Sequence, residues 1–332
     1  MQNARRIVVL GSNSFSGSDF IDHLLDQPAT EILAISRSPE KSAVFLPYRD
    51  RSSPPLRFVQ ADLNHDIPTI LREIDAFEPQ YIVNFAAQSE VAPSWQHPEH
   101  WFETNTVALA KLIHALKDRR YLRKYLHISS PEAYGTCVGS IDETAPLNPS
   151  TPYAASKAAA DLLLQTYLRN YDFPLVTVRS TNVYGAHQQL FKIIPRSVIR
   201  LRRDEIIELH GGGQAVKSFI HIRDISRGEE LILEKGRVGE LYHLSPDQGY
   251  RVCDIVERIC IALGKNFATS TRVVAERLGQ DAAYVIDSTK ARNEFAWSPQ
   301  VSIDQGLTGV IAWVERFWSD ILKLPHEYQH AA

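Results

Sequence analysis

Short apolar runs alternate with amphipathic segments through the first 180 residues, and this alternation limits the fold more than any other feature. We expect six runs to be strands: residues 6–11, 31–36, 56–62, 81–87, 125–130 and 174–180. Helix-like stretches follow these runs, except before residue 56, where the chain reads as a loop. The pattern predicts an α/β protein with a doubly wound, Rossmann-type parallel sheet that binds ligands at the carboxyl ends of its strands.

The pattern changes after Tyr184. Residues 206–213 and 218–224 look like isolated strands, whereas 252–264 and 308–322 look like helices. We therefore divide the chain into a dinucleotide-binding domain of residues 1–184 and a smaller region of residues 185–325, with room for some segments to return to the first domain. We expect the last residues, HEYQHAA, to be frayed.

The composition argues against several classes of protein. The formal net charge is −3, so no strongly basic face is expected to bind nucleic acid. The longest apolar runs fall short of the roughly 18 residues that span a bilayer. Three cysteines without metal or paired spacing fit a reducing compartment. We expect a cytoplasmic protein with no metal site, no nucleic-acid partner and no membrane segment.

A turn with two glycines lies between the first expected strand and the first expected helix, in VVLGSNSFSG. Gly11 and Gly17 stand where a tight turn would meet the pyrophosphate of a dinucleotide, beside the free amides of a helix N-terminus. Ser14 replaces the middle glycine of the usual pattern. Taken alone, the turn fits either a cofactor site or an ordinary strand-to-helix connection.

The end of the second strand bears on the choice of cofactor. An acidic residue there would bind the ribose hydroxyl of NAD, but Ser36, Arg37 and Ser38 follow one another here. Arginine suits a 2′-phosphate, so Arg37 favours NADP, with NAD as the alternative. The other interpretation of Arg37 is an exposed side chain in solvent. Asp62, after the third strand, either contacts the adenine side or caps a turn.

Tyr153 and Lys157 are four residues apart in TPYAASKAAAD, which places them on one face of a helix. We expect the Lys157 ammonium to lower the pKa of the Tyr153 phenol, so that Tyr153 exchanges a proton with a substrate hydroxyl. Ser130, at the end of the preceding strand, could hold the same hydroxyl.

Five motifs in order carry a resemblance: GSNSFSG (11–17), NFAAQSEV (84–91), ISSPEAYG (128–135), YAASK (153–157) and TNVYG (181–185). With them the chain resembles the extended short-chain dehydrogenase/reductase superfamily. Its later segments, such as HGGGQAVKSFIHIRD, are similar to those of nucleotide-sugar 4,6-dehydratases of the dTDP-glucose and GDP-mannose types. The resemblance implies conversion of a nucleotide-diphosphate hexose to its 4-keto-6-deoxy product, by internal hydride transfer through a tightly bound nicotinamide cofactor. It also implies that residues 185–325 mainly bind the nucleotide sugar.

Glu132 is the most informative residue under this resemblance. Relatives that are 4-epimerases usually have a small, non-acidic residue at this position, whereas dehydratases usually have glutamate. A 4-ketone acidifies the C5 hydrogen, and Glu132 is expected to remove that proton as the C6 hydroxyl leaves. The dTDP-glucose type has an aspartate at the position of Pro131, so Glu132 would here deliver the proton to the C6 oxygen itself. The alternative is a structural carboxylate that holds a loop.

The resemblance assigns residues to three sets: catalytic, cofactor-binding and substrate-binding. At the position of Lys217, one of the substrate-binding set, relatives usually have arginine. The expected catalytic residues are Ser130, Glu132, Tyr153 and Lys157. The expected cofactor-binding residues are Gly11, Asn13, Ser14, Phe15, Ser16, Gly17, Ser36, Arg37, Ser38, Asp62, Leu63, Ala86, Ala87, Gln88, Asn105, Tyr153 and Lys157. The expected substrate-binding residues are Ser89, Glu90, Ser130, Glu132, Asn182, Lys192, Arg196, Lys217 and Arg277.

Other functions stay open at this point. A 4-epimerase, a 5,6-dehydratase and a uronate decarboxylase use the same fold, although no arginine near Tyr153 is placed to bind the carboxylate that a decarboxylase removes. A cofactor-sensing or scaffold protein is the non-enzymatic alternative, and it would have no need of Ser130, Tyr153 and Lys157 together. As in many relatives, residues 103–116 and 153–168 would form a four-helix contact in a homodimer or homotetramer.

Overall fold

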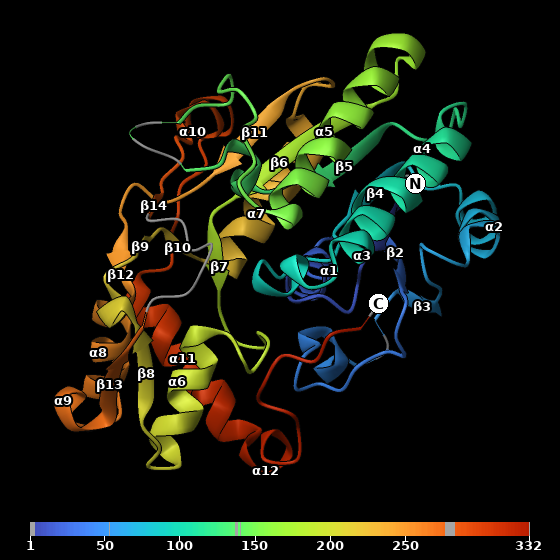
Figure 1. Cartoon of the computed structure of the whole chain (residues 1–332). Coiled ribbons are helices and arrows are strands. Elements are labelled where there is room, and N and C mark those ends of the chain that lie inside the picture. The colour runs from blue at the N-terminus through green and yellow to red at the C-terminus, as the bar shows by residue number, and fades with distance from the viewer. Residues whose placement is uncertain (1–3, 53, 137–138, 140, 276–282, 332) are drawn as a thin grey trace.

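A parallel sheet forms the centre of the protein, as the sequence predicts (Figure 1). The computed structural model describes residues 4–52, 54–136, 139, 141–275 and 283–331. Within these residues seven strands pair in the order β11-β6-β5-β4-β1-β2-β3, and every pairing is parallel. The strands are β1 (Arg5–Leu10), β2 (Thr30–Ser36), β3 (Leu56–Gln60), β4 (Tyr81–Asn84), β5 (Lys124–Ile128), β6 (Leu175–Ser180) and β11 (Leu241–Leu244).

Helices cover both faces of the sheet because successive residues of each strand point to opposite sides. In β1, Ile7 and Val9 join a hydrophobic cluster with side chains of α1 and α7, while Val8 and Leu10 join a second cluster with α2, α4 and α5. Both faces of β1 are therefore buried, which confirms the doubly wound architecture. The helices are α1 (Phe15–Leu24), α2 (Ile67–Phe77), α4 (Leu109–Leu116), α5 (Pro152–Tyr171) and α7 (Ile222–Lys235).

The chain leaves the sheet after β6 and later returns to it. α7 packs against α1, where the Ser226 hydroxyl donates to the Asp19 carboxylate at 2.7 Å, and β11 then pairs with β6. The sequence allowed such a return but did not predict a strand at residues 241–244. The strand expected over residues 218–224 is shorter, because β10 (Phe219–His221) ends where α7 begins.

A separate hydrophobic core lies beyond the sheet. Ile194 and Val198 of α6 pack with Ile259 of α8, Val314 of α11 and Tyr184 of β7. Three small sheets, β10-β7, β12-β9-β14 and β13-β8, flank this core within the described residues. The elements are β7 (Asn182–Tyr184), α6 (Ile193–Arg202), β8 (Ile207–His210), β9 (Val216–Lys217), β12 (Tyr250–Arg251), α8 (Val252–Ala262), α9 (Phe267–Ser270), β13 (Thr271–Val274), β14 (Ala283–Tyr284), α10 (Thr289–Phe295), α11 (Ile303–Arg316) and α12 (Trp318–Ile321).

Short helical turns connect the longer elements. They comprise 3₁₀ turns at Pro47–Asp50, Ala92–Trp95, Pro131–Tyr134 and Gly211–Gly213, the short helix α3 (Pro98–Phe102), and a π-helical stretch, Glu103–Ala108. The chain before residue 56 is a loop with one such turn, as predicted. Among the described helices, we find none with the length and apolar character that a membrane crossing requires.

The C-terminal segment, residues 325–331, packs against the protein, so the expectation that it is frayed is wrong. The chain runs from α12 back to the region of α3 (Figure 1). The His330 ring stacks on Trp101 of α3 with ring centroids 5.3 Å apart, and the Tyr328 ring meets Phe191 edge-on at 5.4 Å. These aromatic partners come from distant parts of the chain, which is why a local reading of the sequence missed them.

Two glycines of α11 give a test of the second core. A Cβ on Gly306 would lie 2.2 Å from the Tyr184 hydroxyl, whereas a Cβ on the exposed Gly309 would meet nothing within 4 Å. We expect Gly306→Ala to lower the free energy of unfolding by about 1–3 kcal/mol through overpacking. Gly309→Ala, on the same helix, should raise it by about 0.5–1 kcal/mol because alanine favours the helix. Urea unfolding of both variants measures this, and equal effects would contradict the packing described.

Candidate active site

The turn after β1 brings two backbones so close that only glycine fits. Gly11 has φ of +79°, and a Cβ on it would lie 2.6 Å from the Ala86 amide nitrogen. A Cβ on Gly17 would lie 2.6 Å from the Gly11 carbonyl oxygen. Ser14 caps α1 by accepting a hydrogen bond from the Gly17 amide at 3.0 Å, so the serine that replaces the usual glycine serves as a helix cap. α1 thus begins where the strand order reverses, between β1 and β4, the usual ligand position in such sheets.

Three cavities adjoin one another, the first two along the carboxyl ends of the central strands and the third in the second region. The first cavity has a volume of about 340 Å³, the second about 400 Å³ and the third about 210 Å³. Ser14, Ala87 and Glu90 line both the first and the second cavity. Asn182 and Phe219 line both the first and the third. Phe191 lines both the second and the third, so each cavity adjoins the other two.

The second cavity lies over the ends of β1, β2 and β3. Asn13 shapes it by donating to the carbonyl oxygen of Ser38 at 3.0 Å and to the Ser38 hydroxyl at 2.8 Å, which fastens the loop after β2 to the turn after β1. Gly17 is not part of the wall, because it packs inside the first turn of α1. The predicted cofactor residues that line the second cavity are Gly11, Asn13, Ser14, Ser36, Arg37, Ser38, Asp62, Leu63, Ala86, Ala87 and Gln88.

Two basic side chains line the second cavity beyond β2. Arg37 is the predicted one, and Lys41 is a residue that sequence reasoning missed. The Lys41 ammonium donates to the Asn13 carbonyl at 3.0 Å, and burial, followed by the charge of Arg37, lowers the pKa of Lys41. A second basic residue four positions after Arg37 was the signal available in the sequence.

The C-terminal segment also reaches the second cavity, which nothing in the sequence indicated. Tyr328, Gln329 and Ala331 line it. The Ala331 carbonyl accepts hydrogen bonds from the Gln88 amide nitrogen Nε2 at 2.7 Å and from Arg37 Nη2 at 3.1 Å. The segment therefore lies across the second cavity, between the β4 loop and the β2 loop.

The first cavity brings together the four residues that the sequence predicts to be catalytic. Ser130, Glu132, Tyr153 and Lys157 all line it. Ser130 begins the 3₁₀ turn Pro131–Tyr134 and accepts a hydrogen bond from the Glu132 amide at 3.2 Å, while its hydroxyl also hydrogen-bonds with Tyr153. The tight turn places the Glu132 carboxylate and the Tyr153 phenol at one wall.

The ionisation of Tyr153 and Lys157 differs from the expectation. Burial, followed by the charge of Glu132, raises the pKa of Tyr153, while the Ser130 hydrogen bond lowers it, so the net direction is upward. The prediction of a lowered phenol pKa is therefore wrong. The Lys157 ammonium instead donates to the Ile128 carbonyl at 2.7 Å, and burial lowers the pKa of Lys157 to about 8.

A buried carboxylate holds the helix that carries Tyr153 and Lys157 against the sheet. Asp161, one turn after Lys157 on α5, accepts hydrogen bonds at 2.6 Å from the Ser129 hydroxyl of the β5 end and from Arg179 Nη2 of β6. Both Asp161 and Arg179 are buried. Sequence reasoning missed this pair, although the spacing of Asp161 from Lys157 placed it on the same helix face.

Asn105 holds the β4 loop rather than lining a cavity wall. Its side chain accepts from the Gln88 amide at 2.8 Å and donates to the Gln88 carbonyl at 3.0 Å and to the Ser156 hydroxyl at 2.9 Å. Asn105 belongs to the π-helical stretch Glu103–Ala108, whose wider turn is typical of functional sites. The loop that carries residues 86–90 is thereby fixed against α5.

The predicted substrate residues divide between the first and third cavities. Ser89, Glu90, Asn182 and Lys192 line the first cavity, where the Lys192 ammonium pairs with the Glu90 carboxylate at 2.7 Å. The third cavity has Asn182, Arg196 and Lys217 in its wall. Phe15 and Ser16, predicted to bind the cofactor, line the first cavity. Arg277 lies outside the described residues.

A serine at a strand end of a Rossmann-type sheet, with a tyrosine and a lysine four residues apart on the next helix, defines the class of short-chain dehydrogenase/reductase proteins. Comparison with known proteins narrows this class. A family model described as GDP-mannose 4,6 dehydratase matches residues 8–310. The dTDP-glucose 4,6-dehydratase of Xanthomonas campestris pv. campestris is 31% identical over 274 residues, which cover 77% of this chain and 78% of the relative. That of Streptomyces niveus is 31% identical over 334 residues and 97% of each chain.

A solved structure agrees with these relatives. DesIV, a dTDP-glucose 4,6-dehydratase from Streptomyces venezuelae with NAD and TYD bound, superposes with a TM-score of 0.86. It is 33% identical, and the match covers 94% of this chain and 97% of that one. The chain therefore belongs to the GDP-mannose 4,6-dehydratase family, the nucleotide-sugar 4,6-dehydratases of the extended short-chain dehydrogenase/reductase superfamily.

The buried lysine gives a prediction that needs no substrate. We expect the ammonium of Lys157 to lose its proton around pH 8, where an exposed lysine would titrate near about 10.4. The charge of Asp161 raises this pKa, so Asp161→Asn should move the titration to lower pH, whereas the exposed Asp118→Asn should not. NMR of the protein with ¹³C-labelled lysine, assigned with Lys157→Arg, measures it. A Lys157 midpoint above about 10 would contradict the described burial.

Proposed function

We propose that the protein removes water from a nucleotide-diphosphate hexose and forms the 4-keto-6-deoxy sugar, with Tyr153 and Glu132 as its proton-transferring groups. The observation that carries this proposal is that both side chains line the first cavity together with Ser130 and Lys157. The neighbouring cavities fit the rest of the ligands. The second has the size and the glycine turn for a dinucleotide, and the third has the basic residues Arg196 and Lys217 for a diphosphate.

The chain's residues would divide the proton transfers between them. Ser130 holds the C4 hydroxyl and Tyr153 takes its proton, with Lys157 in the wall of the same cavity. A nicotinamide cofactor held by the residues of the second cavity would supply a reversible hydride acceptor for this reaction. Glu132 would remove the C5 proton and give it to the C6 hydroxyl, which leaves as water. Pro131 has no proton to give, so Glu132 serves both steps. When hydride is added at C6, C5 takes up one proton, which balances the proton that Tyr153 took from the C4 hydroxyl.

We further propose NADP as the cofactor. The support is electrostatic, because Arg37 and Lys41 place two positive charges in the second cavity beyond β2, where a 2′-phosphate would lie. Ser36 and Ser38 stand where an NAD-binding chain would offer a carboxylate. NAD remains the alternative, since the relative DesIV has NAD bound.

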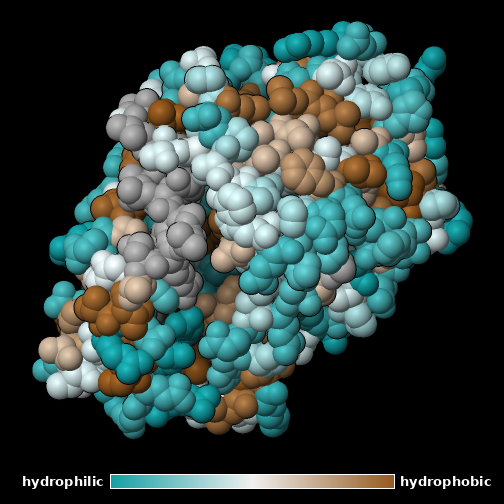
Figure 2. Space-filling model, in the orientation of Figure 1, coloured by the Kyte–Doolittle hydropathy of each residue, from teal (hydrophilic) through white to brown (hydrophobic). Residues whose placement is uncertain are grey.

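We also propose that the enzyme is a cytoplasmic homodimer or homotetramer. Apolar side chains lie on the outer surface over α4 and α5 (Figure 2). Val107, before α4, and Leu162, on α5, are 48% and 61% exposed, as suits a contact between copies. The free thiols of Cys253 and Cys260 fit a reducing compartment.

The smaller region, residues 185–325, would supply the diphosphate contacts of Lys192, Arg196 and Lys217.

A panel of nucleotide sugars tests the proposed reaction. The purified protein is incubated with GDP-mannose, dTDP-glucose, CDP-glucose, UDP-glucose and UDP-N-acetylglucosamine, with and without added NADP, and the products are weighed by mass spectrometry. Loss of one water from one sugar is the expected result. A new isomer of unchanged mass would instead make the protein an epimerase.

Glu132→Gln separates the two chemical stages. We expect the variant to reduce the cofactor normally, as measured by absorbance, but to release water about a thousandfold more slowly, because an amide cannot act as a general base. Tyr153→Phe is the matched comparison, and it should slow both stages. Dehydration by Glu132→Gln at the wild-type rate would remove Glu132 from the mechanism.

Arg37→Ala tests the choice of cofactor. Losing a charged partner of a phosphate should weaken NADP binding by about tenfold to a hundredfold and leave NAD binding nearly unchanged. Arg57→Ala, which removes an exposed arginine of β3, should change neither affinity. Calorimetric titration of cofactor-depleted protein measures both. Equal loss of NAD and NADP affinity would show that Arg37 does not bind the 2′-phosphate of NADP.

A further inference from the structure

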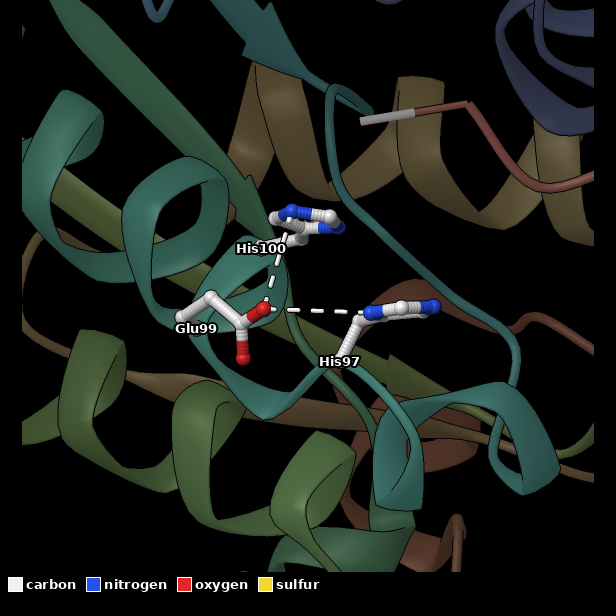
Figure 3. A group of neighbouring side chains, drawn as sticks. All are labelled: His97, Glu99 and His100. Atoms are coloured by element: carbon white, nitrogen blue, oxygen red, sulfur yellow. Dashed lines mark ion pairs between the residues drawn. The ribbon is translucent and has the colours of Figure 1, made fainter.

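Three histidines and one glutamate gather at α3, away from the proposed reacting groups. One oxygen of Glu99, Oε1, lies 3.8 Å from His97 Nδ1 and 3.7 Å from His100 Nε2 (Figure 3). The third histidine, His330, belongs to the C-terminal segment, and its ring lies parallel to both others at 5.1–5.2 Å. The side chains of His97 and Glu99 are 46% and 58% exposed, so solvent ions reach them.

The geometry points to a divalent transition-metal site: we propose that His97, Glu99 and His100 bind Zn²⁺ or a similar cation, and that the bound metal fastens the C-terminal segment across the second cavity. In the part of the chain that the structure describes, these three residues are the one such group with ligand atoms all within 4.8 Å of one another. Two imidazoles and a carboxylate are a known zinc ligand set that leaves a fourth position for water. The sequence analysis predicted no metal site, so this inference departs from it.

Metal binding needs a turn of one ring and small changes in spacing, because the His97 and His100 rings stack with centroids 5.2 Å apart and 15° between their planes, and an imidazole binds a metal in its own plane. Ligand atoms around a tetrahedral zinc at normal bond lengths lie about 3.3 Å apart. The distances of 3.7 and 3.8 Å from Glu99 therefore have to shorten by about half an ångström. His97 and Glu99 are at the surface and can turn toward an ion. His100 is more enclosed, with 24% exposure, and gives the site a fixed ligand.

His330 connects the metal site to the C-terminal segment. His100 Nδ1 lies 2.8 Å from His330 Nε2, so one ring must donate the proton and the other accept it. A metal on His100 Nε2 leaves the proton on Nδ1, which makes His100 the donor. His330 then carries its own proton on Nδ1, 3.0 Å from the Tyr328 hydroxyl, and donates it there. The ion would thus fix the direction of both hydrogen bonds, from His100 to His330 and from His330 to Tyr328.

The consequence concerns the second cavity. Tyr328 and Ala331 line it on either side of His330, and Ala331 is bonded to Gln88 and Arg37. Fastening His330 therefore holds this wall in place. The metal site does not depend on the proposed function, because the cavity is covered by the segment whatever ligand it binds.

Calorimetric titration of the full chain with Zn²⁺ at neutral pH tests the site. We expect one zinc per chain with micromolar or tighter affinity. His97→Ala and Glu99→Gln, which change exposed side chains, should each weaken binding by about a hundredfold. The loss of His330, a partner of a ligand, should cost about tenfold. His65→Ala, at another exposed histidine, should have no effect. Zinc binding that is unchanged in the His97 and Glu99 variants would overturn the site.

Hydrogen–deuterium exchange tests the fastening. Zinc should slow amide exchange in residues 325–331 at least fivefold in the wild-type chain, and exchange in α2 should stay constant as an internal reference. In His330→Ala, zinc should still bind but should no longer protect the segment. Equal protection in this variant, or none in the wild type, would overturn the proposed link. Circular dichroism of each variant confirms that it is folded.

Discussion

The buried carboxylate of Asp161 is the interaction on which the candidate site depends. A single oxygen, Oδ2, accepts hydrogen bonds from Ser129 and Arg179, so one side chain of α5 binds the carboxyl ends of both β5 and β6. Removing an ionic group from water is costly, and the cost is offset only when charge and hydrogen bonds are both satisfied. Because Lys157 lies one turn earlier on the same helix, this contact fixes the height and rotation of the catalytic helix against the sheet.

The same contact extends to the returning strand. The Arg179 guanidinium lies 4.1 Å from the centre of the Tyr134 ring, and the Tyr134 hydroxyl donates to His243 Nε2 of β11 at 2.7 Å. Burial lowers the pKa of His243 to about 4, so this histidine is a neutral acceptor whose other nitrogen donates to the Asp287 carbonyl. Tyr134 ends the turn that carries Glu132. The position of the proposed base is therefore set by a network that starts at α5 and ends in β11.

The sequence predicted what periodicity and local spacing determine. The alternation of Ile7 and Val9 with Val8 and Leu10 marks a strand buried on both faces, and the Tyr153–Lys157 spacing places both on one helix face. The sequence did not predict the features that depend on contacts between distant segments of the chain. The direction in which the Tyr153 pKa shifts depends on burial and on Glu132. The position of residues 325–331 depends on the ring of Trp101 in α3 and on the ring of Phe191, just before α6. Lys41 and Asp161 carried weak signals that only the folded arrangement makes meaningful.

The return of the chain to the sheet limits how the protein can be taken apart. The polypeptide passes from the sheet to the second core after β6, comes back through α7 and β11, and leaves again toward α8. α10 then packs on β11 before α11 joins the second core once more. Because the chain passes several times between the central sheet and the second core, no single hinge separates these two parts. Neither part is an interchangeable module, and a single cut between them would leave both attached. Such a molecule should unfold as one cooperative unit.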